Sequence, residues 1–236
     1  MAVDEAPVCL VTGVGPGTGA ALCRRFARES YRVAMLARSA QRLAELERQI
    51  PGTKAFPTDV TDVAALRATL ARVRAELGPV RVLLHNAGNA SFGDLLHVTV
   101  EQLEEAFRIN TSALLVCGQE LAPDMIAAGG GAIVVTGATA SLRGGVAFAA
   151  FAPAKAAQRA LAQSMARLLG PQGVHVAYVI VDGVIDMPTT RALLPDRPQE
   201  TFLSPDAIAE VYWQLVQQDR SAWTFELDLR PFCEKW

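Results

Sequence analysis

The chain has 236 residues, enough to bury the core of one large α/β domain. Its formal net charge is −2 and it contains no basic run, so nothing in its electrostatics favours nucleic acid as a partner. Asp4, Glu5 and Pro7 interrupt the N-terminus, and no later stretch reaches the roughly 18 apolar residues of a membrane-spanning helix. We therefore expect a cytoplasmic protein without membrane contact, with one domain over residues 1–236.

The four cysteines lie far apart in the sequence, without a second cysteine or a histidine at ligand spacing. They are Cys9, Cys23, Cys117 and Cys233. We interpret them as buried free thiols, and we expect no metal site.

Short runs rich in Val, Ile and Leu alternate with longer amphipathic segments, a pattern typical of βαβ units around a parallel sheet. Strands are predicted at 8–12, 32–37, 54–57, 81–86, 131–136, 175–181 and 222–229. Helices are predicted from near Gly19 and at 41–49, 63–77, 100–121, 154–169 and 205–218. The prediction is a Rossmann-type, doubly wound α/β fold of about seven strands in the order 3-2-1-4-5-6-7.

A glycine-rich segment, TGVGPGTG at 12–19, follows the first predicted strand. Gly13, Gly17 and Gly19 stand where the backbone must turn sharply and bring amides close to a pyrophosphate. The spacing GxxxGxG differs from the general dinucleotide fingerprint GxGxxG. It predicts a nucleotide-phosphate loop, and the alternative is an ordinary glycine-rich turn.

Further motifs follow the later predicted strands in a fixed order. Asp59-Val60 follows the third strand, His85-Asn86-Ala87-Gly88 the fourth, Asn110 lies within the next long helix, and Lys155 lies near the start of a later one. This ordered set resembles the short-chain dehydrogenase/reductase family, and the resemblance extends over the chain to about Gly183.

The resemblance implies a role for each matching residue. The phosphate loop falls on Gly13, Gly17, Thr18 and Gly19, the adenine contact on Asp59 and Val60, and the element NNAG on His85 to Gly88. Asn86, Ala87 and Gly88 would lie beside the cofactor, while His85, which replaces an asparagine, is interpreted as structural. Lys155 would bind the nicotinamide ribose, and Asn110 would hold a helix kink and a water that links this lysine to solvent. Gly183 and Ile185 match the turn that wraps the nicotinamide, although Asp182 replaces its proline.

The end of the second strand indicates which nicotinamide cofactor fits. A carboxylate there would bind the ribose hydroxyls of NAD and repel a 2′-phosphate, but Ala37 is followed by Arg38 and Ser39. Arginine can hold a phosphate through two hydrogen bonds. We therefore predict that NADP(H) is preferred over NAD(H), with a solvated Arg38 as the alternative. Pro16 stands where many NADP-binding relatives have a second basic residue.

Two hydroxyl groups that the resemblance implies are missing. The family uses a tyrosine to protonate the substrate carbonyl and a serine, thirteen residues earlier, to orient it. Phe151 and Ala138 occupy these positions and preserve the spacing. None of the three tyrosines matches a catalytic position. Thr139 and Ser141 are candidates for orienting a substrate or for closing a turn. Asp182 is a speculative proton donor if burial raises its pKa, and the alternative is a role in anchoring its loop.

The substrate pocket is expected to be mainly apolar. Its predicted lining is Phe92, Arg143, Phe148, Phe151 and the segment from Met187 to Leu194. This lining favours a lipophilic or aromatic carbonyl compound over a sugar. We expect an NADP(H)-dependent oxidoreductase with a degenerate active site, and the alternative is a non-catalytic NADP(H)-binding sensor, scaffold or partner subunit. The last strand and the aromatic tail at 230–236 predict a homodimer or homotetramer.

Overall fold

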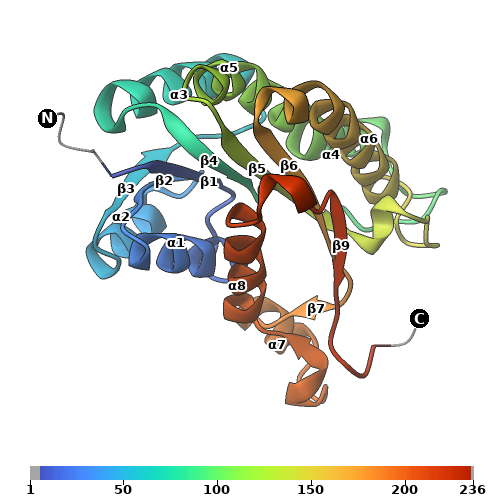
Figure 1. Cartoon of the computed structure of the whole chain (residues 1–236). Coiled ribbons are helices and arrows are strands. Elements are labelled where there is room, and N and C mark those ends of the chain that lie inside the picture. The colour runs from blue at the N-terminus through green and yellow to red at the C-terminus, as the bar shows by residue number, and fades with distance from the viewer. Residues whose placement is uncertain (1–5, 235–236) are drawn as a thin grey trace, which may run out of the picture.

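The apolar runs of the sequence form a seven-stranded parallel sheet in the computed structural model, which describes residues 6–234 (Figure 1). Asp4, Glu5 and Trp236 therefore lie outside the described residues. The strands are β1 (Val8–Thr12), β2 (Arg32–Ala37), β3 (Thr53–Pro57), β4 (Val80–His85), β5 (Gly131–Ala138), β6 (Val174–Val181) and β9 (Glu226–Leu229). They are ordered β3-β2-β1-β4-β5-β6-β9, with every pair parallel. The predicted Rossmann-type fold and strand order are confirmed, with β9 as the seventh strand.

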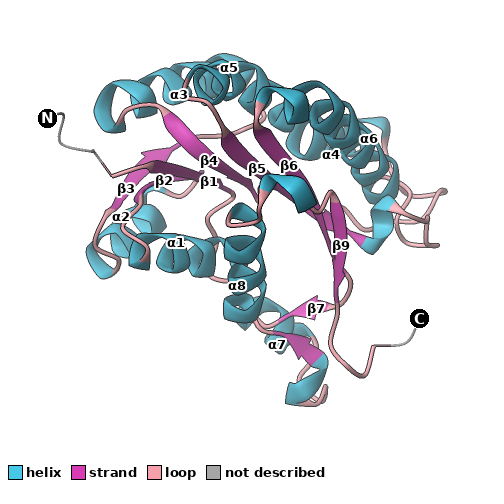
Figure 2. Ribbon diagram, in the orientation of Figure 1, coloured by secondary structure: helices cyan, strands magenta, loops and turns pink. Residues whose placement is uncertain are grey.

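Helices cover both faces of the sheet (Figure 2). One face carries α1 (Thr18–Arg28), α2 (Ala40–Gln49) and α8 (Pro205–Val216), and the other carries α3 (Val63–Leu77), α4 (Val100–Phe107), α5 (Ala113–Ala127) and α6 (Phe151–Leu169). Alternate residues of each strand enter opposite layers, because side chains alternate along a strand. In β1, Val8 and Leu10 join the core under α3, α5 and α6, while Cys9 and Val11 join the core under α1, α2 and α8.

The predicted helix at 100–121 is interrupted. The chain forms α4, then a π-helical turn at Arg108–Ser112, then α5, which continues to Ala127. The amide of Ala113 bonds to the carbonyl of Arg108, five residues earlier, which defines the wider turn. Hydrophobic periodicity cannot show this insertion, because the apolar face continues on both sides of it. Asn110 lies within the turn.

The last strand is shorter than predicted. Residues 222–225 precede β9, and Arg220–Ala222 forms a 3-10 turn in which the Asp219 side chain accepts a hydrogen bond from the Ser221 amide at 2.9 Å. Trp223 stacks on the ring of His175, with centroids 4.8 Å apart. The alternation of apolar residues at 223–229 therefore reflects packing before the strand as well as within it.

The helix bearing Lys155 begins at Phe151, three residues before the predicted start, and Pro153 lies in its first turn, where a missing N–H does not disrupt the helix. A region absent from the prediction follows β6. It contains a small parallel pair of β7 (Val184–Ile185) with β8 (Phe202–Leu203), and α7 (Pro188–Leu193) between them. Short 3-10 turns lie at Thr139–Ser141, Gly170–Gln172 and Gln199–Thr201.

The cysteines are only partly as predicted. Cys9, Cys23 and Cys117 are buried, whereas Cys233 is exposed in the segment after β9. No helix among residues 6–234 has both the length and the apolar character needed to cross a membrane.

Candidate cofactor and substrate site

A cavity of about 740 Å³ opens at the carboxyl ends of β1, β4, β5 and β6. Ligands of open α/β sheets bind at this edge, where the strand order changes direction between β1 and β4. The cavity brings together most of the predicted site residues. They are Gly13, Gly17, Thr18, Gly19, Asn86, Gly88, Phe92, Ala138, Phe148, Phe151, Lys155, Asp182, Gly183, Ile185 and Met187.

The phosphate loop connects β1 to α1 through two positions where only glycine fits. Gly13 has φ +69°, and a Cβ there would lie 2.6 Å from Cα of Ala87. A Cβ at Gly19 would lie 2.6 Å from the carbonyl oxygen of Gly13. Helix α1 begins at Thr18, whose Oγ1 is buried and has no hydrogen-bond partner among the described residues. A helix N-terminus with an uncommitted hydroxyl is suited to a pyrophosphate.

Met187 lies against the same loop, since a Cβ on Gly17 would lie 2.6 Å from its Cγ and Sδ atoms. The residue predicted for the substrate pocket thus also packs against the phosphate loop.

The segment after β4 braces the loop through hydrogen bonds. The Asn86 side chain donates to the carbonyl of Gly13 at 2.9 Å, and the Ala87 amide donates to Thr12 Oγ1 at 3.1 Å. His85 Nδ1 lies 3.2 Å from the same Thr12 oxygen. Burial and the nearby charge of Lys155 lower the pKa of His85 to about 3, so the ring is neutral near neutral pH. These contacts agree with the structural role expected for His85.

A second cavity of about 270 Å³ lies beside the phosphate loop, at the end of β2. Its lining includes Ala37, Arg38, Ser39, Arg42, Asp59, Val60, Ala87 and Gly88. Ser39 also caps α2, because its Oγ accepts a hydrogen bond from the Arg42 amide at 3.3 Å. Arg42 was not predicted; it lies in the first turn of α2, three residues after the N-cap Ser39. The cavity thus has two arginines.

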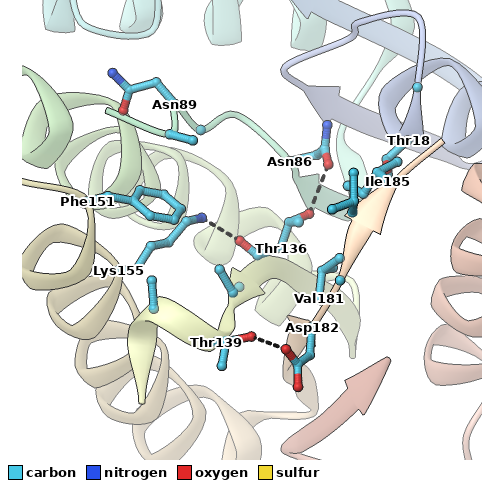
Figure 3. Close-up of a pocket in the computed structure, with 18 of the residues that line it drawn as sticks. Thr18, Asn86, Asn89, Thr136, Thr139, Phe151, Lys155, Val181, Asp182 and Ile185 are labelled. Carbon is cyan, nitrogen blue, oxygen red and sulfur yellow. Dashed lines mark hydrogen bonds between the residues drawn. The ribbon is translucent and has the colours of Figure 1, made fainter. Parts of the chain in front are cut away.

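Ala138 and Phe151, which the resemblance assigns to the positions of the catalytic serine and tyrosine, both line the larger cavity. Ala138 ends β5, and Phe151 is the first residue of α6, with its ring centroid 5.9 Å from Lys155 Nζ (Figure 3). Phe92, Phe148 and Phe151 form a continuous aromatic wall, with centroid separations of 5.6, 6.5 and 6.1 Å. Arg143 also lines the cavity.

Lys155 is buried at the base of this wall. Its ammonium donates to the Thr136 carbonyl at 2.8 Å and to Gln158 Oε1 at 3.0 Å, and the first of these bonds is drawn in Figure 3. Burial lowers the pKa of Lys155 to about 7. Gln158 is fully buried and was not predicted, although a polar residue three positions after a candidate lysine shares its helix face.

Asp182 follows β6 and is bound to two neighbouring elements. Its Oδ1 accepts a hydrogen bond from Thr139 Oγ1 at 2.6 Å, and its Oδ2 lies 3.4 Å from the guanidinium of Arg230 (Figure 3 shows the first contact). Ser141 donates to the carbonyl of Ala138 at 2.7 Å. The hydroxyls of Thr139 and Ser141 are therefore both hydrogen-bonded to neighbouring protein groups.

The fold and this site define an α/β protein with a dinucleotide-type cleft at the carboxyl edge of its sheet. Comparison with known families identifies it further. A family described as short chain dehydrogenase matches residues 7–198, and the chain belongs to this family of oxidoreductases.

Relatives of known structure and sequence support this assignment. A short-chain dehydrogenase from Rhodopseudomonas palustris is 37% identical, with a TM-score of 0.83 over 96% of this chain and 99% of that one. A protein named "Probable galactose dehydrogenase GalD" from Rhizobium meliloti (strain 1021) is 35% identical over 86% of this chain and 77% of its own length. A metagenomic short-chain oxidoreductase in complex with NADP is 27% identical, with a TM-score of 0.83 over 98% of this chain and 99% of that one.

Proposed function

We propose that the protein binds NADP(H) in the cleft and acts as a slow oxidoreductase on a lipophilic carbonyl or alcohol compound. One observation carries this proposal: the cofactor cleft and Lys155 are in place, while Ala138 and Phe151 contribute no hydroxyl to the same cavity. The cleft thus has the groups that bind and position a dinucleotide, but not the usual proton donor.

The residues present fit the cofactor. The unpartnered hydroxyl of Thr18 at the start of α1 and the glycine contacts around it suit a pyrophosphate. Asp59 and Val60 would face the adenine, Lys155 the nicotinamide ribose, and Gly183 and Ile185 the nicotinamide. When bound, NADPH supplies the hydride. A relative that is 27% identical is described in complex with NADP.

Two arginines favour NADP(H) over NAD(H). Arg38 and Arg42 line the small cavity in which a 2′-phosphate would lie, and Ser39 lines it too. No carboxylate stands directly after β2 to repel the phosphate. Arg42 supplies the second basic group that Pro16 does not.

The aromatic wall supports a lipophilic substrate. Phe92, Phe148 and Phe151 present ring faces and edges, which offer no hydrogen bonds to the hydroxyls of a sugar. The relative named as a galactose dehydrogenase shows the family, and its name does not give the substrate of this chain.

Slow turnover follows from the missing acid. Loss of a general acid or base lowers a rate by about 10² to 10⁴, while positioning of hydride and carbonyl remains. The remaining candidates for proton supply are a water relayed through Lys155 and the carboxyl group of Asp182.

The alternative is a cofactor-binding protein without turnover. The polar groups near the cavity favour this alternative, because they already bind other protein groups. Asp182 contacts Thr139 and Arg230, and Ser141 donates a hydrogen bond to a backbone carbonyl.

A titration of the purified protein with NADPH, followed by NADPH oxidation with a panel of lipophilic ketones and aldehydes, tests the proposal. We expect micromolar binding and slow oxidation that Lys155→Met reduces. Binding with no oxidation across the panel supports the non-catalytic alternative, and no binding contradicts both.

A further inference from the structure

Gln158 joins two groups that the family resemblance links through a water. Its Oε1 accepts a hydrogen bond from Lys155 Nζ at 3.0 Å, and its Nε2 donates to the backbone carbonyl of Asn110 at 2.7 Å. The side chain is fully buried between α6 and the π-helical turn. The connection between Lys155 and Asn110 is therefore made by protein atoms.

The chemistry of both partners requires a bridging group that both accepts and donates a hydrogen bond. An ammonium only donates hydrogen bonds and a carbonyl only accepts them, so the bridging side chain must accept at one end and donate at the other. Glutamine meets both needs, and the two hydrogen bonds fix which end of its amide faces Lys155 and which faces Asn110. Glutamate would lose the donor, and methionine would lose both groups at similar length.

The bridge determines how the ammonium meets the cavity. A charged lysine has three N–H groups, of which one binds the Thr136 carbonyl and one binds Gln158. The third remains for the cavity that Lys155 lines, below the ring of Phe151. Gly88 lies close to the same place, since a Cβ on it would lie 3.5 Å from Lys155 Nζ.

The neighbouring side chains His85 and Tyr178 do not change their charge near neutral pH. Burial lowers the pKa of His85, on β4, to about 3, and raises the pKa of Tyr178, on β6, to about 12. The Tyr178 hydroxyl, which has one hydrogen to donate, lies 3.3 Å from the Lys155 carbonyl oxygen and 3.4 Å from Gln158 Oε1. Arg159, the next residue of α6, pairs with Glu226 on β9. Lys155 is thus the group of this described cluster that titrates between pH 5 and 9.

We propose that Gln158 is a positioning residue: its amide replaces the water link between Asn110 and Lys155 and aims a single ammonium N–H at the cofactor. The part of this inference that concerns the cofactor rests on the proposed function. The part that concerns Lys155 does not, because the bridge lies within the protein.

The test uses the protein without cofactor, labelled with ¹³C at the lysine ε-carbon. The chain has three lysines, Lys54, Lys155 and Lys235, so the spectrum is simple, and Lys155→Met assigns the buried signal. We expect Gln158→Met to lower the pKa of Lys155 by about one unit, because the ammonium loses an acceptor. We expect Gln158→Glu to raise it, because a carboxylate then faces the ammonium. Gln163→Met, on the same helix, should leave it unchanged.

A second measurement connects the bridge to cofactor binding. We expect Gln158→Met to weaken NADPH binding about tenfold at pH 7, while Gln163→Met does not. If the folded Gln158→Met and Gln158→Glu proteins both keep the wild-type pKa of Lys155, the residue only fills space and the proposal is wrong. If Gln158→Met does not fold, the test rests on the Gln158→Glu protein, in which the pKa of Lys155 is expected to rise. Failure of NADPH to bind wild type contradicts the proposed function and leaves the titration result intact.

Discussion

Lys155 is a buried residue whose ionisation depends on the fold. Burial lowers its pKa to about 7 from an ordinary 10.5. Between these values the unfolded chain carries the lysine proton and the folded protein does not, so the free energy of unfolding rises with pH across this window. Below about pH 7 both states carry the proton, and the buried charge destabilises the fold.

Replacing Lys155 with Met should therefore stabilise the protein most at low pH. The difference in unfolding free energy, wild type minus Lys155→Met, should rise between pH 7 and 10, as measured by urea denaturation. Wild type and variant are compared because a second effect acts on both proteins. Burial raises the pKa of Cys23 and Cys117 to about 12, so both proteins lose stability from these thiols above about pH 9, and the subtraction removes this loss. A difference that does not change with pH would mean that Lys155 is charged throughout.

Arg38 is expected to determine the cofactor preference. Arg38→Asp should reduce or reverse the preference for NADPH over NADH, because one ionic contact to a 2′-phosphate contributes about 1.5–3 kcal/mol, roughly ten- to a hundredfold in affinity. Arg48→Asp, at the other end of α2, is the matched control. Calorimetry with both cofactors measures the ratio, and equal affinities for wild type contradict the assignment.

At the scale of elements, Asp182 connects three strand ends. It follows β6, accepts a hydrogen bond from Thr139 after β5, and pairs with Arg230 after β9. We expect Asp182→Asn to lower the free energy of unfolding by about 1.5–3 kcal/mol, because a charge-assisted contact is lost from a largely buried place. Any slow carbonyl reduction should persist if a water relayed through Lys155 supplies the proton. Loss of activity with unchanged stability would instead show that Asp182 is the proton donor.

Most strands were predictable because they are apolar runs of ordinary length, and the parallel order follows from alternation with helices. The last strand, β9, alternates polar and apolar residues, and its start was predicted too early. The glycine loop and the segment after β4 could also be placed, since each follows a strand that ends at one edge of the sheet. The kink at Asn110 was expected from the resemblance, but the apolar pattern of 100–121 did not mark the π-helical turn that produces it. Nor did the sequence mark the pair of β7 with β8, whose strands are two residues each.

The site residues likewise divide into those that the sequence indicated and those that only the structure revealed. Phe151 and Ala138 were assigned to the family's catalytic positions from the spacing and do line the cavity, but the roles of these positions stay a prediction. Gln158 and Arg42 were missed because polar residues on helices are usually solvated, and only the fold shows that one is buried against Lys155 and the other lines a cavity. The contacts of Asp182 depend on Arg230, forty-eight residues later in the sequence.

For the whole molecule, exposed apolar side chains favour assembly. Leu115 on α5 and Leu168 on α6 are exposed, and Phe232, after the edge strand β9, is 88% exposed. We expect a homodimer or homotetramer in light scattering at micromolar concentration, and a smaller mass for Leu115→Glu with Leu168→Glu. A monomeric wild-type mass would contradict this.

We infer that the molecule retains a cofactor-binding oxidoreductase frame and lacks the two catalytic hydroxyl oxygens that the family resemblance implies. Ala138→Ser combined with Phe151→Tyr restores both, and the rate of ketone reduction with NADPH is the measurement. We predict that the double variant is faster than wild type by about 10² or more, and that each single change does less because both hydroxyls act on one carbonyl oxygen. NADPH affinity should stay within a few-fold. A double variant that binds NADPH normally but remains inert, or a wild type that already turns over at about 1–10³ s⁻¹, would contradict the claim.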